Sequence, residues 1–136
     1  MKVTGFDHLV LTVASIEATV AFYTHVLGMT AETFGPQRRT ALIFGPHKIN
    51  LHQADRTFEP KAAQPTMGSA DLCLLVDDCA AIAAHLAACG VAIIEGPVRR
   101  SGARGPITSY YLRDPDQNLI ELSAHDPADD ATETAT

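Results

Sequence analysis

Two histidines and one glutamate lie in or beside apolar runs, where a polar side chain needs a partner. His8 opens the run His-Leu-Val-Leu-Thr-Val, His52 follows Ile-Asn-Leu, and Glu121 interrupts Leu-Ile-Glu-Leu. An ionised carboxylate there is costly to desolvate unless it meets a cation, a metal ion or several hydrogen-bond donors. Imidazole and carboxylate groups are also the usual ligands of divalent metals. We therefore predict a metal site made by His8, His52 and Glu121, with Asp71 as an optional fourth ligand.

The chain shows the same order of elements twice. Each half begins with a short apolar run typical of a strand, continues with apolar residues at helical spacing and closes the helix with a glycine. The first strands are expected at 6–13 and 70–76, and the helices that follow are expected to end at Gly28 and Gly90. This overlay of the two halves places Asp71 at the position of His8.

Three further strands are expected after each helix, because Gly and Pro divide the remaining residues into short pieces. The expected ranges are 30–34, 40–44 and 48–53 in the first half, and 91–95, 108–112 and 118–123 in the second. When the turn beginning Gly45-Pro46 is aligned with the turn beginning Asp114-Pro115, His52 falls at the position of Glu121.

These elements predict an α+β fold of two βαβββ modules, which together form a curved mixed sheet around a cleft. We expect one domain over residues 1–125, with module one at 4–53, a Pro-containing linker at 54–69 and module two at 70–123. Residues 126–136 lack apolar anchors and are expected to form a flexible tail. Phe22, Tyr23 and Phe44 are predicted core residues.

Composition narrows the classes of partner. The net charge is −6 and the basic residues are scattered, so neither a nucleic-acid partner nor a membrane surface is indicated, whereas a small-molecule substrate is. No apolar run approaches the length of a membrane span. The three cysteines lack Cys-x-x-Cys spacing, which favours reduced, buried thiols in a cytoplasmic protein.

Three segments of the sequence resemble the vicinal oxygen chelate superfamily, which includes glyoxalase I, fosfomycin-resistance transferases, extradiol dioxygenases and bleomycin-binding proteins. They are Phe6-Asp-His-Leu-Val-Leu-Thr-Val, the helix end Phe22-Tyr-x-x-Val-Leu-Gly-Met, and Asp114-Pro-Asp-x-Asn-Leu-Ile-Glu. Within that superfamily, segments such as Phe44-Gly-Pro-His-Lys-Ile-Asn-Leu-His are similar to the glyoxalase domain-containing protein 5 group.

The resemblance implies metal ligands near the start of the first strand and the end of the fourth strand of each module. These positions are His8, His52, Asp71 and Glu121. The ligand types differ from those of bacterial-type glyoxalase I, which usually carries a carboxylate at the second position and a histidine at the third. The donor set suits Zn²⁺, Ni²⁺, Mn²⁺ or Fe²⁺.

Substrate contacts are expected on the strand before the last turn. Similarity to fosfomycin-type members implies that Ser109 and Tyr111 hydrogen-bond substrate oxygens, and strand alternation places both on one face. The segment 99–106, which contains Arg104, is rich in guanidinium and glycine. We interpret it either as a loop that orders over an anionic ligand or as a solvated, flexible loop.

The resulting hypothesis is a metal-dependent lyase or isomerase whose substrate chelates the metal through neighbouring oxygens, with Glu121 as the catalytic base. An Fe²⁺-dependent dioxygenase using two histidines and a carboxylate is the second reading. A metal-free small-molecule binding protein, as in antibiotic resistance, is the third. Unpaired sheet edges and the resemblance together imply a homodimer.

Overall fold

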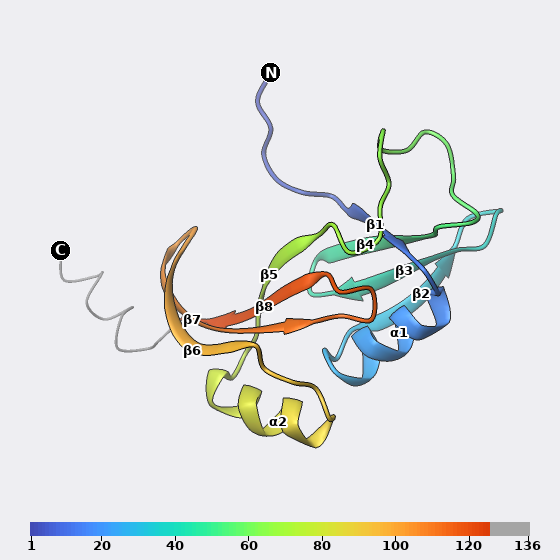
Figure 1. The fold of residues 1–136 in the computed structure, drawn as a ribbon. Helices are drawn as coiled ribbons and strands as arrows, with labels where there is room; N and C mark the ends of the chain where they lie inside the picture. The colour runs from blue at the N-terminus through green and yellow to red at the C-terminus, as the bar shows by residue number, and fades with distance from the viewer. Residues whose placement is uncertain (126–136) are drawn as a thin grey trace. The chain divides into compact units, whose positions relative to one another are not determined.

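A computed structural model of the protein describes residues 1–125 and divides the chain into two compact units (Figure 1). The first unit comprises Met1–Ala70 together with Asp114–Gln117, and the second comprises Asp71–Arg113 and the described residues from Asn118 onward. The predicted flexible tail at 126–136 lies outside the described residues.

The first unit is a four-stranded sheet in the order β1-β4-β3-β2, with β1 parallel to β4 and the other pairs antiparallel. Helix α1 connects β1 to β2 and contacts three strands of the sheet. The Ser15 side chain caps this helix by accepting a hydrogen bond from the Ala18 amide at 3.1 Å. The elements are β1 (Leu9–Val13), α1 (Ile16–His25), β2 (Thr30–Phe34), β3 (Arg39–Phe44) and β4 (His47–Gln53).

The second unit repeats this arrangement with the strand order β5-β8-β7-β6, again with its outer pair, β5 and β8, parallel. Its helical segment begins with a short 3-10 turn capped by Asp78 and continues as α2. The elements are β5 (Asp71–Leu75), η1 (Cys79–Ala81), α2 (Ile82–Ala88), β6 (Glu95–Gly102), β7 (Gly105–Arg113) and β8 (Leu119–Ala124).

Each unit has an apolar core that includes one face of its sheet and side chains of its helix. In the first unit this core includes Tyr23 of α1, as predicted, with Leu42 and Leu51 of the sheet. In the second it includes Leu86 of α2 with Leu112 and Ile120. Because side chains alternate along a strand, the opposite sheet face carries most of the polar residues discussed below. The prediction of two βαβββ modules in an α+β fold is confirmed.

The prediction of a strand at 91–95 followed by a loop at 99–106, whether ordered over an anion or flexible, is wrong. Strand β6 runs through this segment and forms a tight hairpin with β7. The Gly96-Pro97 pair, whose composition suggests a break between strands, lies inside β6 at an irregularity in the pairing. Gly96 has φ +131, and a Cβ there would lie 2.7 Å from the Ser109 carbonyl oxygen. Glycine therefore marks a close approach of two strands rather than their end.

Strand pairing also corrects the alignment of the two halves. Val10 pairs with Asn50 in the first unit, and Cys73 pairs with Glu121 in the second. Val10 and Cys73 occupy the same place in the overlay of the first strands. Asn50, and not the predicted His52, therefore corresponds to Glu121.

The error of two residues arose from the turns. Gly45 and Pro46 alone join β3 to β4, whereas residues 114–118 join β7 to β8. Turns of different length cannot be aligned residue by residue, although their compositions are alike. A shift of two residues keeps the same sheet face, so His52 and Asn50 lie on one face of β4.

The turn between β7 and β8 belongs to the first unit and is anchored there. The Tyr23 hydroxyl donates to Asp114 Oδ2 at 2.7 Å, with both residues buried. The Ala14 amide donates to Asp116 Oδ1 at 3.2 Å. Burial, and then the hydrogen bond to Asp114, raise the pKa of Tyr23 well above its usual range. The hydroxyl therefore keeps its proton and remains a donor.

The prediction of buried cysteines is wrong. Cys73 and Cys89 are exposed and Cys79 is half-buried. Cys73 lies on the polar face of the edge strand β5, and Cys89 ends α2, so neither side chain reaches a core. Within residues 1–125, no helix is long and apolar enough to cross a membrane.

Candidate functional site

The polar face of the second sheet holds Glu121 in a network of hydroxyl groups. Ser109 Oγ donates to Glu121 Oε2 at 2.6 Å, and Ser123 Oγ lies 3.3 Å from the same oxygen. Both serines are fully buried, while Glu121 is half-buried. A distance of 2.6 Å is typical of a hydroxyl bonded to an ionised carboxylate. The structure thus provides the hydrogen-bond donors that an ionised Glu121 needs in an apolar setting.

The hydrogen bonds around Glu121 have a defined direction. Ser109 has one hydroxyl proton, which it donates to Glu121, so it accepts from Ser123 over their 2.7 Å Oγ to Oγ contact. Ser123 in turn can accept from the Cys73 thiol at 3.3 Å. The chain of donors therefore runs from Cys73 through the two serines and ends at the carboxylate, which fixes its orientation.

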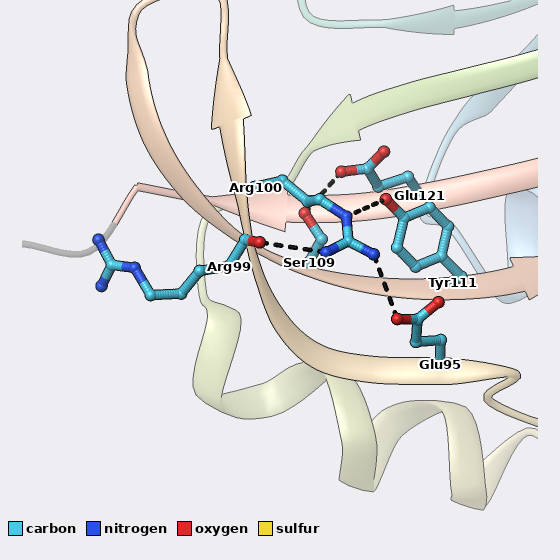
Figure 2. A network of polar contacts seen from close by, with 6 residues as sticks. All are labelled: Glu95, Arg99, Arg100, Ser109, Tyr111 and Glu121. Atoms are coloured by element: carbon cyan, nitrogen blue, oxygen red, sulfur yellow. Dashed lines mark hydrogen bonds and ion pairs between the residues drawn. The ribbon is translucent and has the colours of Figure 1, made fainter.

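Glu121 lacks a basic partner in the described part of the chain. Figure 2 shows that the nearby Arg100 is instead engaged elsewhere. Its Nε donates to the Tyr111 hydroxyl at 3.0 Å, and its Nη2 lies 3.1 Å from Glu95. Among residues 1–125, the groups that stabilise the negative charge of Glu121 are therefore neutral donors. Such a carboxylate can accept a proton or a cation from a ligand.

The predicted substrate residues on this sheet lie in different places. Ser109 and Tyr111 share a face with Glu121, because β7 pairs Ser109 with Ser123 and Tyr111 with Glu121. Arg104 does not join them, since it lies exposed in the two-residue turn between β6 and β7. Sequence reasoning singled out Arg104 and missed Arg100.

His52, on the first sheet, is held by an arginine. Arg39 Nη2 lies 2.8 Å from His52 Nε2. A guanidinium cannot accept a hydrogen bond, so Nε2 must be the unprotonated, accepting nitrogen of a neutral imidazole. Burial, and then the charge of Arg39, lower the pKa of His52. The side chain also packs edge-on against Phe58, with ring centroids 5.4 Å apart.

His8 and Asp71 are both exposed, each at or next to the start of its strand. His8 Nδ1 lies 2.7 Å from Asp7 Oδ1. An ionised carboxylate only accepts, so Nδ1 carries a proton, and in the neutral ring the lone pair is on Nε2. A carboxylate that orients an imidazole in this way is a frequent feature of metal-ligating histidines.

Asn50 is a residue of interest that the sequence did not reveal. It is 5% exposed, and its Oδ1 is buried without a hydrogen-bond partner in the described residues. A buried, unsatisfied amide oxygen is uncommon and points to a missing partner. The one signal for Asn50 is the strand register, which places it at the position of Glu121. The turns before the two strands differ in length, so this register could not be recognised from the sequence.

The predicted metal ligands fit a divalent cation unequally. His8 presents a free imidazole nitrogen, and Glu121 presents a carboxylate without a basic partner in residues 1–125. His52 does not fit, because its Nε2 already accepts from Arg39. Neither unit by itself gathers three His, Cys, Asp or Glu side chains that could hold a metal ion, among the residues described.

Comparison with known proteins gives a consistent family. The Glyoxalase/Bleomycin resistance protein/Dioxygenase superfamily matches residues 5–122. The chain is 52% identical over 129 residues to Virulence protein STM3117 of Salmonella typhimurium, covering 92% of this chain and 87% of the relative. It is also 52% identical over 129 residues to Glyoxalase domain-containing protein RDO1 of Mycosarcoma maydis, covering 94% and 72%.

Solved structures agree with the sequence matches. The crystal structure of the Salmonella protein matches with a TM-score of 0.89, covering 93% of this chain and 100% of that one. More distant structures share the fold. They include the fosfomycin resistance protein FosX of Listeria monocytogenes with Mn(II), at 16% identity and a TM-score of 0.65, and a lactoylglutathione lyase of Agrobacterium tumefaciens, at 19% and 0.69.

Proposed function

Because the chain belongs to the Glyoxalase/Bleomycin resistance protein/Dioxygenase superfamily, we propose that it is a metal-dependent lyase or isomerase. Its substrate would be a small molecule that offers two neighbouring oxygens. The observation that carries this proposal is the Glu121 carboxylate, oriented by Ser109 at 2.6 Å and without a basic partner in the described residues. Because segments of its sequence are similar to the glyoxalase domain-containing protein 5 group, we propose that the protein belongs to that group. We also expect it to be a cytoplasmic homodimer.

Glu121 is the proposed proton carrier. The Ser109 hydroxyl holds one carboxylate oxygen in place, which leaves the carboxylate correctly oriented to remove a proton from a carbon next to a carbonyl group. Tyr111, whose hydroxyl oxygen accepts from Arg100, can donate its own proton to a substrate oxygen. Arg104 is a weaker candidate for a substrate contact, because it lies in the exposed hairpin turn.

From the family resemblance, His8 in the first unit and Asp71 and Glu121 in the second unit are each proposed as metal ligands. A divalent cation there would act as a Lewis acid toward the substrate oxygens. His52 could join these ligands only if the hydrogen bond from Arg39 to its Nε2 were broken. We therefore leave His52 out of the proposed metal ligands. The FosX structure contains Mn(II), which makes Mn²⁺ a suitable first ion to test beside Zn²⁺, Ni²⁺ and Fe²⁺.

The proposal is tested with protein purified without a His-tag and loaded with each ion in turn. We expect near-stoichiometric binding of one ion and turnover of a glutathione adduct of an α-oxoaldehyde, used as the probe. Glu121→Gln should abolish turnover, because the amide cannot accept the proton. Glu32→Gln, at an exposed site on β2, is the matched control and should retain it. A Glu121→Gln variant as active as the control would refute the role of Glu121.

A metal-free binding function is the second candidate, and the occupied Nε2 of His52 favours it. A related fold is found in the antibiotic binding protein TnmS3, at 23% identity and a TM-score of 0.72. Failure to bind any of the four ions would support this candidate. Oxygen consumption by the Fe²⁺-loaded protein would instead indicate the dioxygenase reading.

A further inference from the structure

Arg39 carries a charge that has no acidic partner within residues 1–125. Its guanidinium lies beside two aromatic rings, 5.6 Å from the Phe34 centroid and 4.6 Å from the Phe58 centroid. One terminal nitrogen donates to the neutral His52 ring, and Nε is buried without a hydrogen-bond partner. Buried charges are normally paired with an opposite charge. Arg39 is half-buried as a whole, but its buried Nε and its lack of an acidic partner in the described residues leave a place for an anion beside it.

Two more arginines line a pocket with Arg39 in the first unit. The pocket has a volume of about 200 Å³, and its lining includes Arg38, Arg39, Arg56 and Phe58. Every lining residue is basic, neutral polar or apolar, so the described lining holds no carboxylate. Arg56 does approach Asp55, at 4.0 Å, but both side chains are largely exposed and their attraction is weakened by water.

The backbone at Arg38 supports a role for this side chain. Arg38 has φ +51, in the left-handed region that favours glycine or asparagine. Its amide donates to the Gly35 carbonyl at 3.1 Å, which closes the turn between β2 and β3. A turn of this kind would be more stable with glycine at that position. Arg38 nevertheless occupies this turn and lines the pocket.

We propose that the pocket lined by Arg38, Arg39 and Arg56 binds a small oxyanion, as free phosphate or as a phosphate or carboxylate group of an organic ligand. Guanidinium groups bind such oxyanions through paired hydrogen bonds. The volume of about 200 Å³ is below the roughly 300 Å³ at which pockets begin to hold whole drug-sized ligands, so a single anionic group is the expected occupant. The site lies entirely in the first unit and does not depend on a metal.

The test uses the full-length protein, stripped of metals with a chelating resin, at constant ionic strength. Inorganic phosphate and malonate are titrated separately while the arginine Nε–H signals are followed by NMR, and sodium chloride serves as the reference salt. We expect saturable shifts of the Arg38 and Arg39 signals with one or both anions. The anion that binds more tightly identifies the group, and the absence of saturable shifts with both anions would overturn the proposal.

Variants locate the binding. Arg38→Gln and Arg56→Gln alter exposed side chains and should each weaken anion binding by about tenfold. Lys2→Gln removes the same charge from an exposed site near the N-terminus and should leave binding unchanged. Equal affinity in all three variants would show that the anion binds elsewhere and would also overturn the proposal. Because the protein is metal-free, this result is independent of the proposed enzymatic function.

Discussion

Replacement of Tyr23 by Phe tests the bond that anchors the turn between β7 and β8. Tyr23 is 0% exposed and Asp114 is 3% exposed, and the hydroxyl lies 2.7 Å from Asp114 Oδ2. Phe preserves the ring and removes only the donor, so little cavity is created. A hydrogen bond to a charged group contributes about 1.5–3 kcal/mol, and loss of the donor leaves a buried carboxylate oxygen short of a partner. We therefore expect a loss of about 2 kcal/mol in the free energy of unfolding.

The assay is guanidinium unfolding followed by far-UV circular dichroism, together with thermal unfolding. A chain of this length should show a decrease in Tm of roughly 6–10 °C for that loss. Tyr110→Phe is the matched control, because its half-buried hydroxyl makes no hydrogen bond within the described residues. It should change the free energy of unfolding by less than about 0.5 kcal/mol. If Tyr23→Phe is no more destabilising than the control, the anchoring role of this bond is refuted.

Two further results are expected from backbone fit and from titration. Gly45→Ala, at φ +52 with no atom within 4 Å of the new Cβ, should cost about 1–2 kcal/mol, and Gly96→Ala should cost clearly more because its Cβ would lie 2.7 Å from the Ser109 carbonyl oxygen. Equal losses in guanidinium unfolding would contradict the close approach. The pKa of folded His52 lies below the ordinary 6.5, so the folded state favours the neutral ring. The stability that this ring contributes should be present above pH 6.5 and should be lost as the pH falls from 6.5 through the pKa of the folded state. Arg39→Gln should raise this pKa in an NMR titration, and an unchanged value would exclude the charge of Arg39 as a cause.

Much of the fold could be predicted because periodicity is a local property of the sequence. Alternation and helical spacing located β1–β4 and both helices, and the structure adds Ser15 as the cap of α1 and Asp78 as the cap of η1. The segment around Gly96 could not be predicted in the same way. A glycine that ends a strand and a glycine that admits a neighbouring strand look identical until the partner strand is known.

The candidate site shows the same division. Glu121 was recognisable because a carboxylate in an apolar run needs donors, and the structure supplies Ser109 directly and Ser123 behind it. The pairing of Arg39 with His52 could not be predicted, because it depends on which residues face each other across antiparallel strands. A turn-based alignment that was wrong by two residues then placed His52 at a position that Asn50 occupies.

The turn at Asp114–Gln117 makes the first unit discontinuous in sequence, because this unit otherwise ends at Ala70. Its flanking strands belong to the second unit, yet its carboxylates bind the Tyr23 hydroxyl and the Ala14 amide of the first. A recombination event that exchanged only one repeat with a relative would separate Tyr23 from Asp114. We therefore expect stable chimaeras of this protein to carry Tyr23 and Asp114 from the same parent.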